Sequence, residues 1–229
     1  MGSFAWLTIS CSEETETQTH PEKGRRMWIV DPLDGTACFV FRQAPNLVSV
    51  LIALYDCDLE RVVCGVELFP IGPKPRLLYA ALGKGAWADG RRLSIPKAVQ
   101  VPLKLAWVNL NHYSDITYET AQVAHARIAL RTPGTACRML TTLSATSGVA
   151  AQILCGEERM SAIIHDNDTR SVKQGPWDTA AVQLLVEEAG GVFVNGITGE
   201  RYDTLKPSLV VIAATQELAD EIRALWKDI

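Results

Sequence analysis

Two carboxylates stand close together where an apolar segment ends in a turn. The sequence Trp-Ile-Val-Asp-Pro-Leu-Asp-Gly-Thr runs from Trp28 to Thr36 and carries the carboxylates of Asp31 and Asp34. A turn shaped by proline and glycine can aim both side chains at one point. Hard cations such as Mg²⁺ bind oxygen ligands, so both carboxylates and the Leu33 carbonyl are candidate metal ligands.

The residues that follow the second carboxylate could hold a phosphate. Gly35 lets the backbone approach a ligand closely, and its amide and that of Thr36 could bind phosphate oxygens. The Thr36 hydroxyl could orient a water molecule. The alternative is an ordinary turn, since Asp, Pro and Gly favour turns for conformational reasons alone. This segment by itself leaves both interpretations open.

A third carboxylate, Asp178, precedes the clearest helix of the sequence. That helix is expected from about Thr179 to Ala189, with an apolar face and the stop signal Gly190-Gly191 after it. Asp178 is therefore either a further metal ligand or a helix N-cap, a position that aspartate often fills.

The elements that must position these carboxylates indicate an α/β protein. We expect a largely β first half, residues 1–110, and an α/β second half, residues 111–229, within one domain, with an antiparallel pair formed by its second and third strands. The expected strands are Met27–Val30, Leu47–Tyr55, Val62–Phe69, Leu77–Ala81, Ala86–Ala88, Leu105–Asn109, Val192–Val194 and Leu209–Ala213. The expected helices are Tyr118–Leu130, Ala145–Leu154, Thr179–Ala189 and Gln216–Trp226. Asp89-Gly90 predicts a hairpin turn.

Composition excludes several other classes of protein. The 229 residues are 48% hydrophobic with a net charge of -4, which gives no basic face for nucleic acid. The longest apolar stretch, Leu47–Tyr55, is too short to span a membrane. The start does not resemble a secretory signal, so we expect a cytoplasmic protein. The six cysteines lack zinc-site spacing and are expected to be reduced core residues.

Taken together, the carboxylate segments resemble the signatures of the inositol monophosphatase family of metal-dependent, lithium-sensitive phosphatases. The first signature, Asp-Pro-(Ile or Leu)-Asp-Gly-Thr with a later Phe, is matched by Trp28–Thr36 and Phe39. The second, Trp-Asp-x-Ala-Ala before a helix that ends in Glu-Ala-Gly-Gly, is matched by Trp177–Ala181 and Glu188–Gly191. Between them, Gly83-Lys84-Gly85-Ala86 and Asp89-Gly90 also resemble family motifs.

The resemblance implies a fold and a site. The fold is the layered α-β-α-β-α sandwich of the inositol monophosphatase and fructose-1,6-bisphosphatase type, N-terminally short here, and often a homodimer. Asp31 would bridge two Mg²⁺ sites; Glu13, from Ser12-Glu13-Glu14-Thr15, and the Leu33 carbonyl would complete the first, while Asp34 and Asp178 would complete the second.

By the same resemblance, one ion would activate a water molecule and the other would stabilise the leaving oxygen. The residues implied to take part in catalysis are Glu13, Asp31 and Thr36, and those implied to meet the substrate phosphate are Asp34, Gly35, Thr36 and Asp178.

Three functions are compatible with these residues. The first is a Mg²⁺-dependent phosphomonoesterase for a small phosphorylated polyol or sugar, with inositol monophosphate as the first guess. The second is a 3'(2'),5'-bisphosphate nucleotidase, although those enzymes usually follow the Thr with Lys-Glu-Phe and this chain has Ala37-Cys38-Phe39. The third is a catalytically weak family member with a binding or assembly role.

The chain departs from the family pattern in several places. Only twelve residues precede Glu13, where the family usually has a helical segment, so the chain is either naturally short or truncated at its start. We therefore expect exposed apolar surface on one face of the sheet. Ser144-Ala145 stands at a usual Gly-Ser pair. Ser171 stands where inositol-preferring members carry Glu, and Lys173 nearby could meet a further anionic group.

Overall fold

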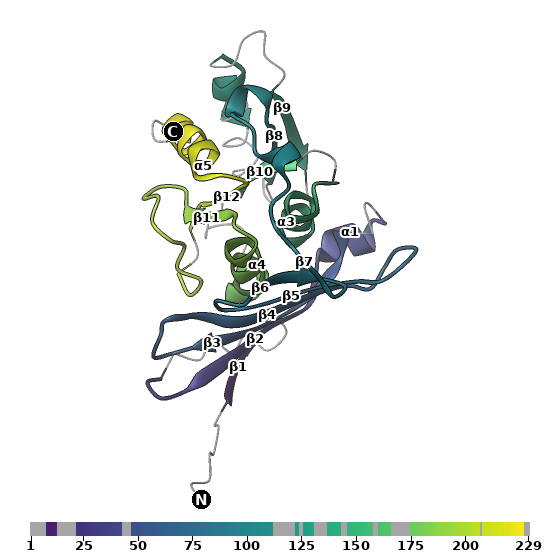
Figure 1. Ribbon diagram of the computed structural model, residues 1–229, viewed down its shortest axis with the longest axis vertical. Coiled ribbons are helices and arrows are strands. Elements are labelled where there is room, and N and C mark those ends of the chain that lie inside the picture. Colours follow the sequence, from purple (N-terminus) through teal and green to yellow (C-terminus); the bar gives the residue numbers. More distant parts are fainter. Residues whose placement is uncertain are drawn as a thin grey trace, which may run out of the picture.

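The computed structural model describes residues 8–12, 22–42, 47–111, 122–123, 126–130, 137–142, 146–157, 160–165, 175–206 and 208–226. These residues form two β-sheets with helices between them and beyond the second one (Figure 1). The first sheet has seven strands in sequence order, and the second has five in the order β11-β12-β10-β8-β9. The expected α/β class is therefore confirmed.

The first sheet is antiparallel apart from its first pair of strands. Its members are β1 (Thr8–Ser12), β2 (Arg26–Asp34), β3 (Ser49–Asp56), β4 (Arg61–Phe69), β5 (Arg76–Ala81), β6 (Gly85–Ala88) and β7 (Arg91–Arg92). β1 runs parallel to β2, and β3 and β4 form the expected antiparallel pair. Asp89 and Gly90 both have positive φ, 47° and 82°, so the predicted hairpin turn joins β6 to β7.

The second sheet mixes parallel and antiparallel pairs. Its members are β8 (Trp107–Asn111), β9 (Arg138–Thr142), β10 (Met160–His165), β11 (Val192–Asn195) and β12 (Val210–Ala213). β8 is parallel to β9 and β10, whereas β12 is antiparallel to β10 and β11. The strand expected at Leu105–Asn109 was placed two residues too early. Two short 3₁₀ turns precede this strand, η3 (Lys97–Val99) and η4 (Leu103–Leu105). Because η4 includes Leu105, the strand begins only at Trp107.

Four helices are described over their full length: α1 (Thr36–Val40), α3 (Thr146–Cys155), α4 (Pro176–Glu188) and α5 (Gln216–Trp226). Three of the four expected helices are confirmed within a few residues. α4 begins three residues before the predicted start, because Pro176 suits the first turn of a helix. Of the helix expected at Tyr118–Leu130, residues 122–123 and 126–130 are helical and the rest lies outside the described residues.

Two apolar clusters hold the layers together. α3 and α4 lie between the sheets, and α5 covers the far face of the second sheet (Figure 1). Ile29 and Leu51 of the first sheet share a cluster with Leu184 of α4, while Val211 and Ile222 belong to the second cluster. The chain passes from the first sheet to the second between residues 92 and 107, near the expected division at 110.

The approach of α4 to the first sheet depends on a glycine. A Cβ atom built on Gly65 of β4 would lie 3.0 Å from the backbone oxygen of Ala181 in α4. Any larger residue would therefore push the helix away from the sheet. Because α4 carries Asp178, this contact also sets the position of a candidate site residue.

The outer face of the first sheet carries exposed apolar side chains. Trp28, Ile52, Leu68 and Leu77 are all exposed. Leu68 pairs with Leu77 across β4 and β5, so these side chains are neighbours on one face. The exposed apolar surface expected from the sequence is present among the described residues.

All six cysteines are free, as expected. Cys11, Cys38 and Cys57 are buried, whereas Cys64 is exposed, so the prediction of a core residue is wrong for Cys64. Its position on β4 turns it to the outer face of the sheet. None of the described helices has the length and apolar character needed to cross a membrane.

Candidate metal centre

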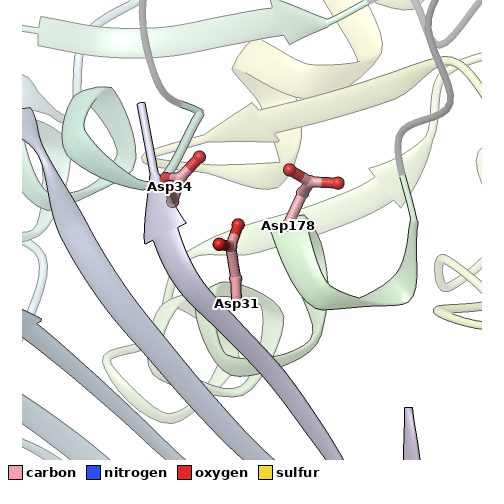
Figure 2. Close-up of side chains that lie close together, drawn as sticks. All are labelled: Asp31, Asp34 and Asp178. Atoms are coloured by element: carbon pink, nitrogen blue, oxygen red, sulfur yellow. The ribbon is translucent and has the colours of Figure 1, made fainter. Parts of the chain in front are cut away.

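Three carboxylates from distant parts of the chain meet at one point. Ligand oxygens of Asp31, Asp34 and Asp178 all lie within 4.8 Å of one another. Figure 2 shows Asp31 and Asp34 on β2 and Asp178 across from them at the start of α4. Asp31 and Asp34 are only 1% and 5% exposed, and Asp178 is half-buried. The cluster is therefore built into the layer between the first sheet and α4.

An irregularity in β2 lets both of its carboxylates face the same way. In a regular strand, residues three apart point to opposite faces of the sheet. Here the pairing with β3 is regular up to Asp31 and resumes at Asp34, with a register shift between them. Pro32, which has no backbone N–H to donate, lies in the interrupted segment. Asp34 therefore returns to the buried face that Asp31 occupies.

The turn after Asp34 is stabilised by its own side chains and by a glycine. Oδ1 of Asp31 accepts a hydrogen bond from the Leu33 amide at 2.9 Å, and the Thr36 hydroxyl donates to the Leu33 carbonyl at 2.9 Å. Gly35 has φ 84° and stands at the N-cap of α1, a backbone conformation that favours glycine. A carbonyl oxygen has a second lone pair, so the bond from Thr36 is compatible with the predicted ligand role of Leu33.

Asp178 lies within the first turn of α4 rather than at its N-cap. Oδ2 of Asp178 accepts a hydrogen bond from the Gly175 amide at 2.8 Å, and the Asp178 amide donates to the Gly175 carbonyl at 3.3 Å. A carboxylate in this place satisfies a backbone donor and suits the positive end of the helix. One side chain thus closes the helix turn and faces Asp31 and Asp34.

Several predicted site residues lie outside the described residues. These are Glu13, Ser144, Ala145, Ser171 and Lys173. Their roles stay predictions, as do the assignments of individual ligands to one ion or the other.

A hydroxyl pair behind Asp34 was missed by the sequence interpretation. The Ser147 hydroxyl of α3 donates a hydrogen bond to Oδ2 of Asp34. The hydroxyls of Ser147 and Ser49 are also bonded to each other, at 2.9 Å. Nothing local in the sequence pairs these residues, because α3 and β3 meet only in the folded chain.

A buried glutamate beside this pair was missed as well. Burial raises the pKa of Glu67 to about 8, and the Asp34 carboxylate acts in the same direction. One signal was available: in Gly65-Val66-Glu67-Leu68-Phe69, strand alternation places Glu67 on the same face as the buried Phe69.

The glycine motif and the end of α4 are bonded to each other. The Glu188 carboxylate accepts hydrogen bonds from the Gly83 and Gly85 amides, each at 2.7 Å. Both glycines have positive φ, 70° and 82°. The motifs that looked independent in the sequence therefore form one structural contact that ties α4 to the β5–β6 turn.

The donor set at Asp31, Asp34 and Asp178 fits a hard divalent cation. Three converging carboxylates repel one another, and a cation between them offsets that repulsion. Oxygen-only ligands suit Mg²⁺ or Ca²⁺ rather than a thiolate-seeking or imidazole-seeking metal.

Comparisons with known proteins find relatives that carry the name of one enzyme family. The model of the inositol monophosphatase family matches residues 8–229. A Thermotoga maritima protein named fructose-1,6-bisphosphatase/inositol-1-monophosphatase is 27% identical over 210 residues, which cover 88% of this chain and 72% of that protein. Human inositol monophosphatase 1 is 29% identical over 203 residues, which cover 85% of this chain and 63% of that protein.

A solved structure has the same fold. An IMPase/NADP phosphatase described as complexed with Mg²⁺ and phosphate superposes with a TM-score of 0.72 at 20% identity, covering 95% of this chain and 72% of that one. The expected layered fold and phosphatase relationship are confirmed at the level of the family. Since the family match extends over residues 8–229, the chain belongs to the inositol monophosphatase family.

Proposed function

We propose that this protein is a Mg²⁺-dependent phosphomonoesterase that acts on a small phosphorylated polyol or sugar. The observation that carries the proposal is the convergence of Asp31, Asp34 and Asp178 within 4.8 Å. The family supplies the reaction class, and the oxygen-only donor set supports Mg²⁺. When bound, the cation neutralises phosphate charge and activates a water nucleophile.

The residues around the cluster have distinct tasks. Asp31, Asp34 and Asp178 hold the cation, with the Leu33 carbonyl as a further oxygen donor. The Thr36 hydroxyl gives its hydrogen to Leu33, so towards a water molecule it acts as an acceptor. A water that donates one hydrogen to Thr36 keeps a lone pair for attack on phosphorus. Phosphoryl transfer needs mainly positioning and charge stabilisation, which this arrangement supplies.

The phosphate itself would lie at the end of β2. The backbone amides of Gly35 and Thr36 stand at the start of α1, where amides are not used within the helix. They support the predicted contact with phosphate oxygens. Glu13 remains the predicted partner of Thr36 in positioning the water.

The two relatives compared by sequence favour a polyol or sugar phosphate, whereas the solved structure described above is named an IMPase/NADP phosphatase. Both curated relatives described above carry inositol monophosphatase names, and one of them is also named a fructose-1,6-bisphosphatase. Inositol monophosphate is therefore the first substrate to test and fructose 1,6-bisphosphate the second. The bisphosphate nucleotidase and the weak-catalyst alternatives are kept as outcomes of the same assay.

The test is phosphate release from a substrate panel with Mg²⁺ and with a chelator. The panel holds inositol 1-phosphate, fructose 1,6-bisphosphate and adenosine 3',5'-bisphosphate. We expect Mg²⁺-dependent release, fastest with one of the first two substrates. Preference for the nucleotide would indicate the nucleotidase. A folded protein that releases no phosphate from any of them contradicts the proposal and favours a binding or assembly role.

A cytoplasmic location and a homodimer are further proposals. The exposed apolar side chains on the outer face of the first sheet, including Trp28 and Ile52, support association with a second copy. Sedimentation of the wild type and of the Ile52→Lys variant tests this. A dimer that becomes a monomer in the variant supports the proposal, and a wild-type monomer contradicts it.

A further inference from the structure

Glu67 is a fully buried carboxyl group whose two oxygens make no hydrogen bond within the described part of the chain. It lies on β4, close enough to Asp34, Ser49 and Ser147 for each of them to act on its pKa. Buried polar groups nearly always have partners, and an unpaired buried charge is strongly unfavourable. The environment of Glu67 therefore disfavours its ionised form.

The hydrogens of the neighbouring hydroxyls are already used. Ser147 donates its single hydroxyl hydrogen to Asp34, which as an ionised carboxylate can only accept. The bond between Ser49 and Ser147 must then use the hydrogen of Ser49. Neither serine has a hydrogen left for Glu67. An ionised Glu67 would meet only oxygen lone pairs there, whereas a neutral carboxyl could donate its proton to either serine.

The charges around Glu67 lead to the same conclusion. Burial and the Asp34 carboxylate raise the pKa of Glu67, while hydrogen bonding from Ser147, the charge of Arg76 and hydrogen bonding from Ser49 lower it, and the resulting pKa is about 8. Arg76 acts on Glu67 through its charge, but the Arg76 guanidinium also pairs with Glu157 at 2.5 Å. The contributions of the two serines are hydrogen bonds, and the hydrogens that they need are used elsewhere, so the hydrogen count and the burial of Glu67 both favour its neutral form.

We propose that Glu67 is a neutral carboxylic acid and a positioning residue for Asp34, acting through the serine pair; this rests on the proposed metal function. If the neutral carboxyl of Glu67 turns to donate its proton to Ser49, hydrogen-bond donation runs in one direction, through Ser49 and Ser147 to Asp34. The chain fixes which way the Asp34 carboxylate turns before the cation binds. Groups that orient metal ligands in this way typically contribute about 10- to 100-fold to metal affinity.

The test is calorimetric Mg²⁺ binding to four variants. Glu67→Gln keeps the size and supplies an N–H donor, so its affinity should stay within about twofold of wild type, a change of about 0.4 kcal/mol. Glu67→Met keeps the volume but has no donor, and Ser147→Ala removes the bond to Asp34. Each should weaken binding about 10-fold. The Glu67→Met/Ser147→Ala double variant should be no weaker than either single variant, because both act through one chain.

Two further readouts separate positioning from a merely structural effect. Infrared spectra should show the carbonyl band of a neutral carboxylic acid in the wild type and its loss in Glu67→Gln. Tyr202→Phe is the control, since it removes a buried hydroxyl among residues such as Tyr55 and Cys57, at the other end of the first sheet. It should leave Mg²⁺ affinity unchanged.

Several results would overturn the role of Glu67. These are a Glu67→Gln variant as weak as Glu67→Met, a Glu67→Met variant that binds like wild type, losses that multiply in the double variant, or the absence of the infrared band. Phosphate release is measured on the same samples. If the variants show the expected Mg²⁺ affinities but the protein releases no phosphate, only the proposed phosphatase function is contradicted. If Glu67→Met has wild-type turnover and wild-type Mg²⁺ affinity, only the role of Glu67 is contradicted.

Discussion

The carboxylate of Asp178 accepts a hydrogen bond from the Gly175 amide at 2.8 Å while it faces the two aspartates of β2. The sequence offered two interpretations of Asp178, a helix cap and a metal ligand. The position of Asp178 suits both purposes, because the third residue of a helix can reach back to the N-cap amide and its carboxylate still lies beside Asp31 and Asp34. The two purposes can be separated by substitution.

Asp178→Asn should remove function and spare the fold. An asparagine keeps the volume and an oxygen acceptor for the Gly175 amide but loses the charge that holds the cation. We expect phosphate release to fall at least about 100-fold, more than for groups that only orient ligands. The free energy of unfolding should stay within about 1 kcal/mol of wild type, whereas Asp178→Ala should lose a further ~1 kcal/mol with the cap.

The matched control is Asp220→Asn, which removes an exposed carboxylate on α5 far from the cluster. It should have wild-type turnover. Full activity in Asp178→Asn would remove this residue from the metal centre.

Glu188→Gln should lower the stability of the fold with little effect on the rate of phosphate release. The two bonds from the Gly83 and Gly85 amides end on separate oxygens of Glu188, and the amide variant keeps only one acceptor. We expect a loss of about 1–2 kcal/mol in the free energy of unfolding, measured by denaturant titration. Glu200→Gln, at an exposed glutamate, is the control. Equal stability of the two variants would show that the contact contributes nothing.

Gly65→Ala should test how closely α4 must approach the first sheet. The added Cβ would lie 3.0 Å from the Ala181 oxygen, so helix or strand must move. We expect about 1–3 kcal/mol of destabilisation and weaker Mg²⁺ binding, because the helix that shifts carries Asp178. Val63→Ala, on the same strand, should lose stability without changing Mg²⁺ affinity. A Gly65→Ala variant with wild-type stability would show that the layers adjust freely.

Glu67 predicts an unusual pH dependence of the metal-free protein. Its pKa of about 8 in the folded state lies above the ordinary glutamate value of 4.5, so the native state holds a proton that the unfolded state releases. Its contribution to stability is therefore fully present below about pH 4.5 and is lost as pH rises towards 8. The slope is at most about 1.4 kcal/mol per pH unit.

Denaturant titrations of wild type and Glu67→Gln between pH 5 and pH 8 (about three pH units) measure this effect. The variant should gain stability relative to wild type as pH rises. Parallel pH profiles would mean that Glu67 titrates at the same pH in both states.

Much of the fold follows from local patterns in the sequence. The largely apolar run Val62–Phe69, the Asp89-Gly90 turn and the apolar face of Gln216–Trp226 each predicted the element that formed, because each reflects short-range geometry. Errors occurred at boundaries. At Leu103–Leu105 a short 3₁₀ turn delayed a strand, and at Pro176 a helix began early.

The convergence of the three aspartates was predictable for a different reason. Asp31 and Asp34 are joined by a turn with a strong local signature, and the family resemblance brought Asp178 to them. The hydrogen bonds that Ser147 makes with Asp34 and Ser49 could not be predicted from the sequence. Ser147 and Ser49 are hydrogen-bonded although they stand 98 positions apart in the chain, and neither stands in a distinctive local pattern. The register shift that returns Asp34 to the buried face depends on pairing with β3, which single-strand periodicity does not describe.

The central claim is that Asp31, Asp34 and Asp178 hold a divalent cation. Crystals grown with Mn²⁺ in place of Mg²⁺ test it most directly, because the anomalous scattering of manganese locates the ion without assumptions about ligands. We predict an anomalous peak in contact with oxygens of all three aspartates, and its loss in Asp178→Asn. A folded crystal with saturating Mn²⁺ and no peak among these carboxylates would contradict the account.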